Sequence, residues 1–157
     1  MKTNTWICDV CGGEITEADR GWVEWLLRTE GEKKIGRGLR LVHAWPHSPR
    51  KNEPRCQYDQ AVERGKDGST LLDGSLSEYV GAGGLMELLF MLSEHELPED
   101  EVIEIIKRPH IPGYEHARMH FNAAIAEQVF EPNTKPGFYK MADINATLAW
   151  LGKKRPE

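Results

Sequence analysis

The sequence predicts an α+β fold, with a small β-hairpin zinc-binding domain over residues 1–65 followed by a compact helical domain over residues 70–152. Two observations lead to this prediction. The first half contains short segments rich in Val, Leu and Trp, separated by turn residues, which is typical of strands. The second half carries apolar residues at helical spacing. Between the halves, the run 66–74 contains two Asp-Gly steps, which favour turns and indicate a boundary.

Three strand-like segments are expected in the first half. Residues 5–15 read as a strand, a tight turn and a return strand, and residues 22–28 and 39–45 read as the two arms of a second hairpin. Side chains alternate between the two faces of a strand, so His43 falls on the same face as Leu39 and Leu41. That face is expected to point inward. Residues 46–55 contain three prolines and are expected to form a loop.

Four helices are expected in the second half. The first, 84–93, is apolar nearly all round, which indicates a central core helix or an interface. The second begins near Pro98, with acidic residues in its first turn, and ends near Arg108. The third covers 112–130 with an apolar stripe that includes Tyr114 and Phe121, and the fourth covers about 142–151.

The cysteines predict a metal site. Cys8 and Cys11 are separated by two residues, a spacing that lets two thiolates chelate one ion from a single turn. Cys56 is the natural third ligand because it is the remaining cysteine. For the fourth position we rank His43 first because a strand end holds its side chain rigidly. His47, in the proline-rich loop, and Asp59 are the alternatives. We expect one structural Zn²⁺ bound by Cys8, Cys11, His43 and Cys56.

The segment W-I-C-D-V-C-G-G-E-I resembles the zinc knuckle of zinc-ribbon and treble-clef domains. The resemblance implies that the knuckle lies at the tip of a β-hairpin and that the metal contributes folding energy to a small domain. It covers about ten residues and concerns metal binding only. The C-terminal half, 71–157, resembles no family in this way.

The charge distribution limits the partners. The net charge of −5 argues against a protein that coats nucleic acid without sequence preference. A local basic group in the first half still offers a nucleic-acid surface, formed by Lys33, Lys34, Arg37, Arg40, Arg50, Lys51 and Arg55. An acidic run follows over 94–104. No stretch approaches the roughly 20 apolar residues of a membrane span, and three cysteines that read as metal ligands suit the cytoplasm.

Three functions are compatible with these features. The first is a non-enzymatic, zinc-stabilised binding or regulatory protein that presents a surface to a protein partner, with a homodimer through the apolar helix 84–93 as one form of contact. The second is a nucleic-acid-binding regulator resembling bacterial antitoxins, with a helix-turn-helix formed by the helices around 98–108 and 112–130. The third is a nuclease, because His43-Ala-Trp-Pro46, Asn52 and Cys56 loosely resemble HNH-type nucleases. A small acidic chain of this kind also suits a bacterial or phage regulator.

Overall fold

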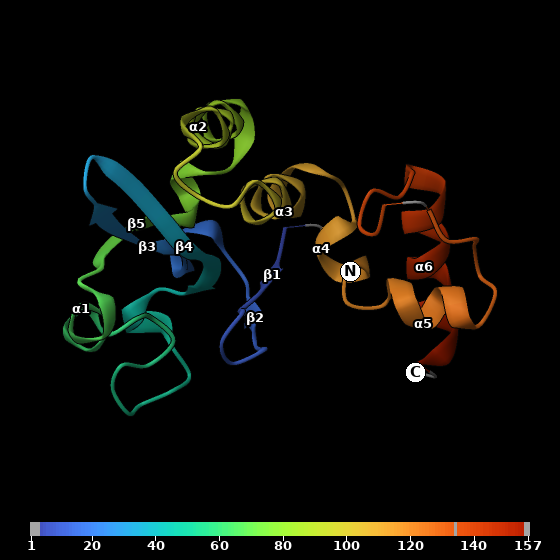
Figure 1. The fold of residues 1–157 in the computed structure, drawn as a ribbon. Coiled ribbons are helices and arrows are strands. Elements are labelled where there is room, and N and C mark those ends of the chain that lie inside the picture. Colours follow the sequence, from blue (N-terminus) through green and yellow to red (C-terminus); the bar gives the residue numbers. More distant parts are fainter. Residues whose placement is uncertain (1–3, 134, 156–157) are drawn as a thin grey trace. The chain divides into compact units, whose positions relative to one another are not determined.

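The computed structural model describes residues 4–133 and 135–155, which form two compact units, Met1–His110 and Ile111–Glu157. Small antiparallel sheets and several helices confirm the predicted α+β class (Figure 1). The first unit holds both sheets and the helices α1 to α3. The second unit holds the helices α4 to α6.

A three-stranded antiparallel sheet with the order β4-β3-β5 forms the centre of the first unit. The predicted second hairpin is confirmed as β3 (Gly21–Glu30) and β4 (Lys33–His43), and its arms are longer than the sequence indicates. Only Gly31 and Glu32 form the turn. Gly31 has a φ of 63°, the left-handed backbone that two-residue hairpin turns favour and that glycine adopts without strain. The strands β1 (Trp6–Ile7) and β2 (Glu14–Ile15) pair as a separate short hairpin.

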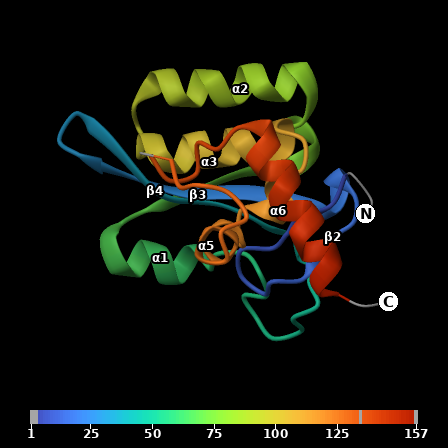
Figure 2. The same cartoon turned by 90° about the vertical axis from the view of Figure 1, so that its right-hand side faces the viewer.

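Helices lie on both sides of the central sheet in the first unit. The helices α2 (Gly81–Glu94) and α3 (Glu99–His110) lie above the strands, and α1 (Gln60–Asp67) lies below them (Figure 2). The side chains between the sheet and α2 and α3 form the main hydrophobic core, which includes Leu41, Leu88 and Ile105. The same core extends to Cys8 and Cys56, so it is continuous with the predicted metal site.

The strand β5 (Thr70–Ser75) is not expected from the sequence. It pairs with β3 over residues 22–27, although Asp73-Gly74 reads as a turn step. The sequence pattern indicates a boundary between residues 65 and 70, whereas the structure continues the first unit through β5, α2 and α3 to His110. The physical reason is that β5 completes the edge of the sheet, a tertiary pairing that local sequence pattern does not reveal. Independent folding of 1–65 and 70–152 stays a prediction.

The second unit has an aromatic core. The ring of Phe121 lies 5.8 Å from that of Tyr114 and 4.7 Å from that of Tyr139, measured between centroids, and Phe130 lies 5.0 Å from Tyr139. Such tilted and edge-on pairs are favourable beyond their buried area. The helix α6 (Met141–Lys154) supplies Ile144 to this core.

The single helix expected over 112–130 is wrong. The segment forms two short helices, α4 (Tyr114–Ala117) and α5 (Phe121–Ala126), separated by turns. The predicted buried stripe nevertheless holds at Tyr114, Ala117 and Phe121. The break between the two helices accompanies the packing of Phe121 against three other rings. Packing of this kind outweighs the helical preference of a local segment.

Candidate metal centre

The first two candidate ligands lie in the tight turn between β1 and β2. The backbone N–H of Cys8 donates to the carbonyl of Gly13 (2.9 Å), and that of Gly12 donates to the carbonyl of Cys8 (2.9 Å). The N–H of Gly13 points at the sulfur of Cys11 (3.4 Å). This arrangement places both sulfurs on the same side of the turn and provides an N–H donor that favours a thiolate.

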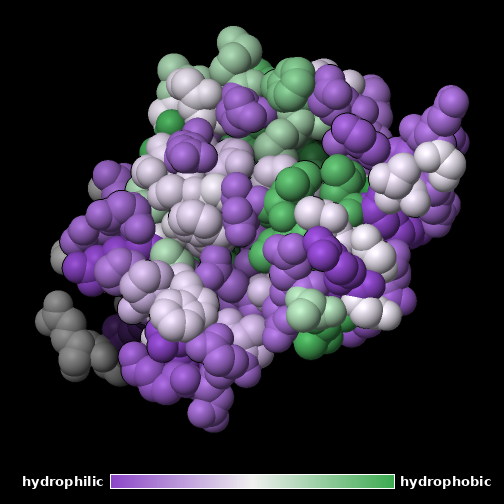
Figure 3. Space-filling model, turned by 90° about the vertical axis from the view of Figure 1, so that its left-hand side faces the viewer, coloured by the Kyte–Doolittle hydropathy of each residue, from purple (hydrophilic) through white to green (hydrophobic). Residues whose placement is uncertain are grey.

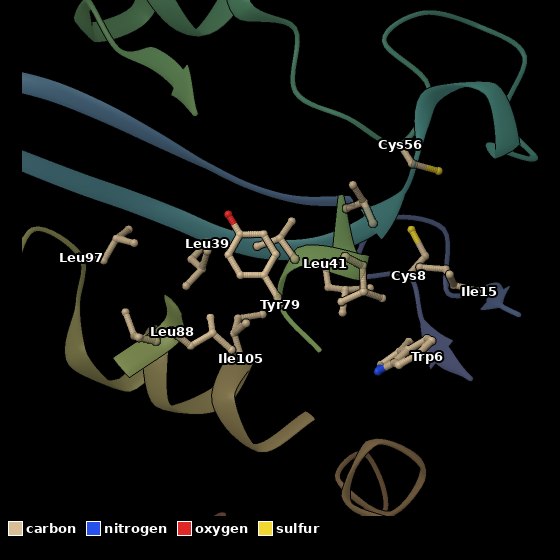
Figure 4. Close-up of a cluster of buried hydrophobic side chains, with 14 residues drawn as sticks. Trp6, Cys8, Ile15, Leu39, Leu41, Cys56, Tyr79, Leu88, Leu97 and Ile105 are labelled. Carbon is tan, nitrogen blue, oxygen red and sulfur yellow. The ribbon is translucent and has the colours of Figure 1, made fainter. Parts of the chain in front are cut away.

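The other two candidate ligands come from the end of β4 and the loop that follows it. His43 is the last residue of β4, and Cys56 precedes α1. Both side chains are buried. Figure 4 places Cys56 and Cys8 close together at one end of the hydrophobic cluster, with Ile15 and Trp6 near Cys8. Apolar side chains thus lie beside Cys8, whereas the sulfur of Cys56 is 3.1 Å from the hydroxyl of Ser48.

The ligand atoms of Cys8, Cys11, His43 and Cys56 all lie within 4.8 Å of one another. The Nδ1 atom of His43 is 3.3 Å from the Cys11 sulfur and 3.9 Å from the Cys56 sulfur. A tetrahedral zinc ion with Zn–S of about 2.3 Å and Zn–N of about 2.0 Å separates sulfur and nitrogen by roughly 3.5 Å. The two measured separations bracket that value. These four side chains can hold a metal ion.

The second ring nitrogen of His43 fixes the orientation of the ring. Its Nε2 lies 3.1 Å from the carbonyl oxygen of Glu14. A carbonyl only accepts hydrogen bonds, so Nε2 carries the proton and donates, which leaves a lone pair on Nδ1 facing the sulfurs. Metal-binding histidines commonly donate their other N–H in this way. The ring is therefore held in the tautomer that a metal ligand needs.

The two rivals for the fourth position lie elsewhere. His47 is exposed in the 3₁₀ turn η2 (Trp45–His47). Asp59 caps α1, where its carboxylate accepts a hydrogen bond from the N–H of Val62 (3.1 Å). Among the described residues, the candidate metal cluster contains neither. The geometry thus favours His43, the residue that the sequence ranks first.

Burial changes the acidity of the site. The pKa of Cys11 is raised to about 11, mainly because the thiol is shielded from water. The neighbouring Cys8 and Cys56 add to this rise, and the hydrogen bond from the N–H of Gly13 opposes it. Without a cation nearby, this thiol therefore stays protonated at neutral pH. A bound cation reverses the balance because it stabilises the thiolates, and its binding releases protons.

An ion pair that the sequence reasoning did not identify holds the turn of Cys8 and Cys11 against the rest of the unit. Arg108, at the end of α3, donates to the carboxylate of Asp9 (2.7 Å) and to the carbonyl of Ile7 (2.8 Å). The same carboxylate accepts the N–H of Leu41 (2.8 Å). Asp9 lies between Cys8 and Cys11, so these contacts fix the turn to both α3 and β4. The sequence feature that could have indicated this contact is the acidic residue, Asp9, between Cys8 and Cys11.

A second ion pair holds the segment that carries Cys56. Glu24 on β3 is fully buried and accepts from Arg40 Nε (2.8 Å) and from the backbone N–H of Tyr58 (3.0 Å). Arg40 also donates to the carbonyl of Cys56 (3.3 Å). Burial raises the pKa of Glu24, and Arg40 and the Tyr58 N–H oppose that rise. One charged pair thus ties the Cys56 segment to the sheet, and another ties the turn of Cys8 and Cys11 to α3.

The basic residues considered for nucleic acid make contacts within the protein. Arg37 pairs with Glu63 (2.9 Å) and Asp67 (3.1 Å), and Arg40 pairs with Glu24. The guanidinium of Arg55 lies over the ring of Trp45, 3.6 Å from its centroid. Lys34 lies 4.0 Å from Glu96. Much of the basic charge is therefore balanced internally.

Comparison of the chain with protein families, with curated proteins and with solved structures found no match. Within the described residues, no helix combines the length and apolar character needed to cross a bilayer. Inferences about function therefore depend on the site itself.

Proposed function

We propose that this chain is a non-enzymatic, zinc-stabilised binding protein in which one Zn²⁺ ion holds the first unit together while the outer surface contacts a protein partner. The observation that supports this most strongly is the group of three cysteines and one histidine, of which all but Cys11 are buried and whose ligand atoms lie within 4.8 Å of one another. A set of this composition suits a structural site.

Zinc is the metal that best fits these donors. Three thiolates and one imidazole are soft or borderline ligands, and their tetrahedral grouping is typical of zinc rather than of calcium or magnesium, which take oxygen ligands. The short hairpin that carries Cys8 and Cys11 agrees with a knuckle of the zinc-ribbon or treble-clef type. A reducing compartment such as the cytoplasm keeps the three thiols available.

A structural role is favoured over a catalytic one. Catalytic zinc sites use three protein ligands and leave one position for water or substrate, whereas four protein ligands close the site. Both nitrogens of His43 face partners, the sulfurs on one side and the Glu14 carbonyl on the other. Activation of water by His43, as an HNH-type nuclease requires, has no support in this geometry.

The nucleic-acid-binding alternative has no specific observation in its favour. The basic residues proposed to contact a phosphate backbone include Arg37 and Arg40, which are engaged in ion pairs. The second helix that this helix-turn-helix would need, over 112–130, is divided into the short helices α4 and α5. We therefore retain protein binding as the proposed role.

Cobalt substitution tests whether the site is closed. Co²⁺ replaces Zn²⁺ in tetrahedral sites and reports its ligands in its visible spectrum. We expect a tetrahedral thiolate spectrum that added azide or imidazole does not change, because no coordination position is open. The same titration on the Cys11→Ser variant provides a control in which one thiolate ligand is lost. A spectrum of the unaltered protein that shifts on addition of azide would overturn the structural role.

A further inference from the structure

The outer face of α2 exposes large apolar side chains. Met86 is 67% exposed, Phe90 is 57% exposed and Leu89 is 43% exposed. The opposite face of the helix is buried at Gly84 and Leu88. Figure 3 shows hydrophobic residues gathered in the upper part of the view, the level at which α2 lies in Figure 1.

The exposed residues form one continuous surface. Residues three and four apart are neighbours on a helix, so Met86 lies beside both Leu89 and Phe90. We call these three residues the α2 face. Single exposed apolar residues are ordinary, but a group rimmed by polar residues marks an interaction site. The charges around the group indicate which kind of partner fits.

Acidic residues line one edge of the α2 face. Glu87 and Glu94 are both exposed and are seven positions apart, which places them on the same side of the helix. Glu99 and Asp100, at the start of α3, are also exposed. No ion pair of Glu87 or Glu94 is present within the described residues. A partner that covers the apolar group therefore meets negative charge along one side.

We propose that the α2 face binds a protein segment that presents apolar side chains next to a row of Lys or Arg, such as a basic amphipathic helix. This inference rests on the proposed function and specifies its partner. Helix-on-helix docking of this type uses apolar anchors at i, i+3 and i+4 and charged residues at the margin. The acidic edge supplies charge complementarity, which fixes orientation and excludes wrong partners.

The same charges disfavour other occupants. In an antiparallel pairing of two copies through this face, the two-fold axis would place the glutamate edge of one copy beside the glutamate edge of the other. Like charges in contact oppose that arrangement. Nucleic acid and anionic membranes carry negative charge and would be repelled as well.

Selection from random peptides tests the proposal and needs no candidate partner. A random library of helical peptides, displayed on phage, is panned against the zinc-loaded full-length protein. Enriched peptides are synthesised, and their dissociation constants are measured by fluorescence anisotropy. The variants are Met86→Ser with Phe90→Ser, which removes the apolar group, and Glu87→Lys with Glu94→Lys, which reverses the edge.

Each variant has a matched control. Val62 on α1 is exposed to a similar extent, 51%, so Val62→Ser controls for the loss of an exposed apolar residue. Glu32→Lys with Glu131→Lys makes the same change in net charge at exposed positions that are not part of α2. Zinc content and thermal unfolding are measured for every variant, so that loss of the fold is not mistaken for loss of binding.

We expect the enriched peptides to combine apolar residues at helical spacing with Lys or Arg. The serine variant should weaken their binding at least about ten-fold, and the lysine variant should weaken it while the two controls leave it unchanged. The proposal would be overturned if no peptide is enriched or if acidic peptides are enriched. It would also be overturned if the α2 substitutions leave the peptide affinity unchanged. A concentration-dependent dimer in ultracentrifugation that the serine variant abolishes would overturn it as well. If the protein instead folds without zinc, the proposed function fails, independently of these results.

Discussion

The two units of the chain use different means to fix their structure. In Met1–His110, the buried side chains of Glu24 and Arg108 and four candidate metal ligands lie within or beside the apolar core. In Ile111–Glu157, the core is a cluster of aromatic and aliphatic side chains around Phe121. Buried charge is common to both units, because Glu115 of the second unit is 4% exposed and pairs with Arg118 (3.2 Å). The comparison teaches that the group of candidate metal ligands is what distinguishes the first unit.

The burial of the candidate ligands indicates how strongly a bound metal would stabilise the first unit. Cys8 and Cys56 are almost fully buried, and His43 is buried as well. Removing the metal leaves thiols and an imidazole at the end of the hydrophobic core, without the bonds that hold separate segments together. Among the described residues, the core of the second unit contains no comparable cluster of candidate metal ligands.

Removal of the metal should therefore separate the behaviour of the two units. With a strong chelator at neutral pH, we expect loss of native signals from Trp6 and from the knuckle, while the aromatic cluster of the second unit keeps its signals. Two-dimensional NMR spectra of the indole and aromatic resonances distinguish the units, because Trp150 belongs to the second and the other tryptophans belong to the first. Simultaneous loss of both sets would mean that the units form one cooperative structure.

Replacement of His43 should have the next largest effect. His43→Ala removes one of four ligands, so we expect a fall in zinc affinity of at least about a hundred-fold and a marked fall in the melting temperature of the first unit. His47→Ala should change neither, because its side chain is exposed outside the cluster.

Zinc release to a colorimetric chelator measures the affinity of each variant. Asp59→Ala serves as a second comparison: loss of its helix cap should cost about 1 kcal/mol in unfolding free energy and leave the zinc bound. If His47→Ala releases the metal and His43→Ala retains it, the assignment of the fourth ligand is wrong.

A change in the second unit should leave the metal unaffected. Phe121→Ala removes a buried ring that contacts three other rings, and we expect a loss of about 3 kcal/mol or more in the unfolding free energy of that unit. Denaturant unfolding followed by the indole NMR signal of Trp150 measures the loss. Zinc affinity should stay at its original value, and a parallel fall would show coupling between the units.

The smallest expected effect concerns the contact between Asp9 and Arg108. Asp9→Asn and Arg108→Met each remove the charge pair that orients the knuckle, and we expect zinc affinity to fall about ten-fold to a hundred-fold with the ligands intact. A double-mutant cycle gives the coupling, since the double variant should lose less than the sum of the two single variants. Additive losses would mean that the two residues act separately.

The sequence predicted those features that depend on residues close to one another along the chain. The spacing of Cys8 and Cys11 predicted the turn that carries them, and strand alternation favoured His43 over its two rivals. Sequence pattern did not reveal β5, because its residues acquire their strand conformation by pairing with β3. It also did not reveal Arg108 as a partner of Asp9, since 99 positions separate them and the fold alone brings them together.

X-ray absorption spectroscopy at the zinc edge, on protein purified with its native metal, tests the metal centre most directly. We expect about one zinc per chain, coordinated by three sulfur atoms at about 2.3 Å and one nitrogen atom at about 2.0 Å. His43→Ala should lose the nitrogen contribution, and His47→Ala should keep it. A folded protein without metal, or a shell with fewer than three sulfur atoms, would contradict the Cys8, Cys11, His43 and Cys56 site.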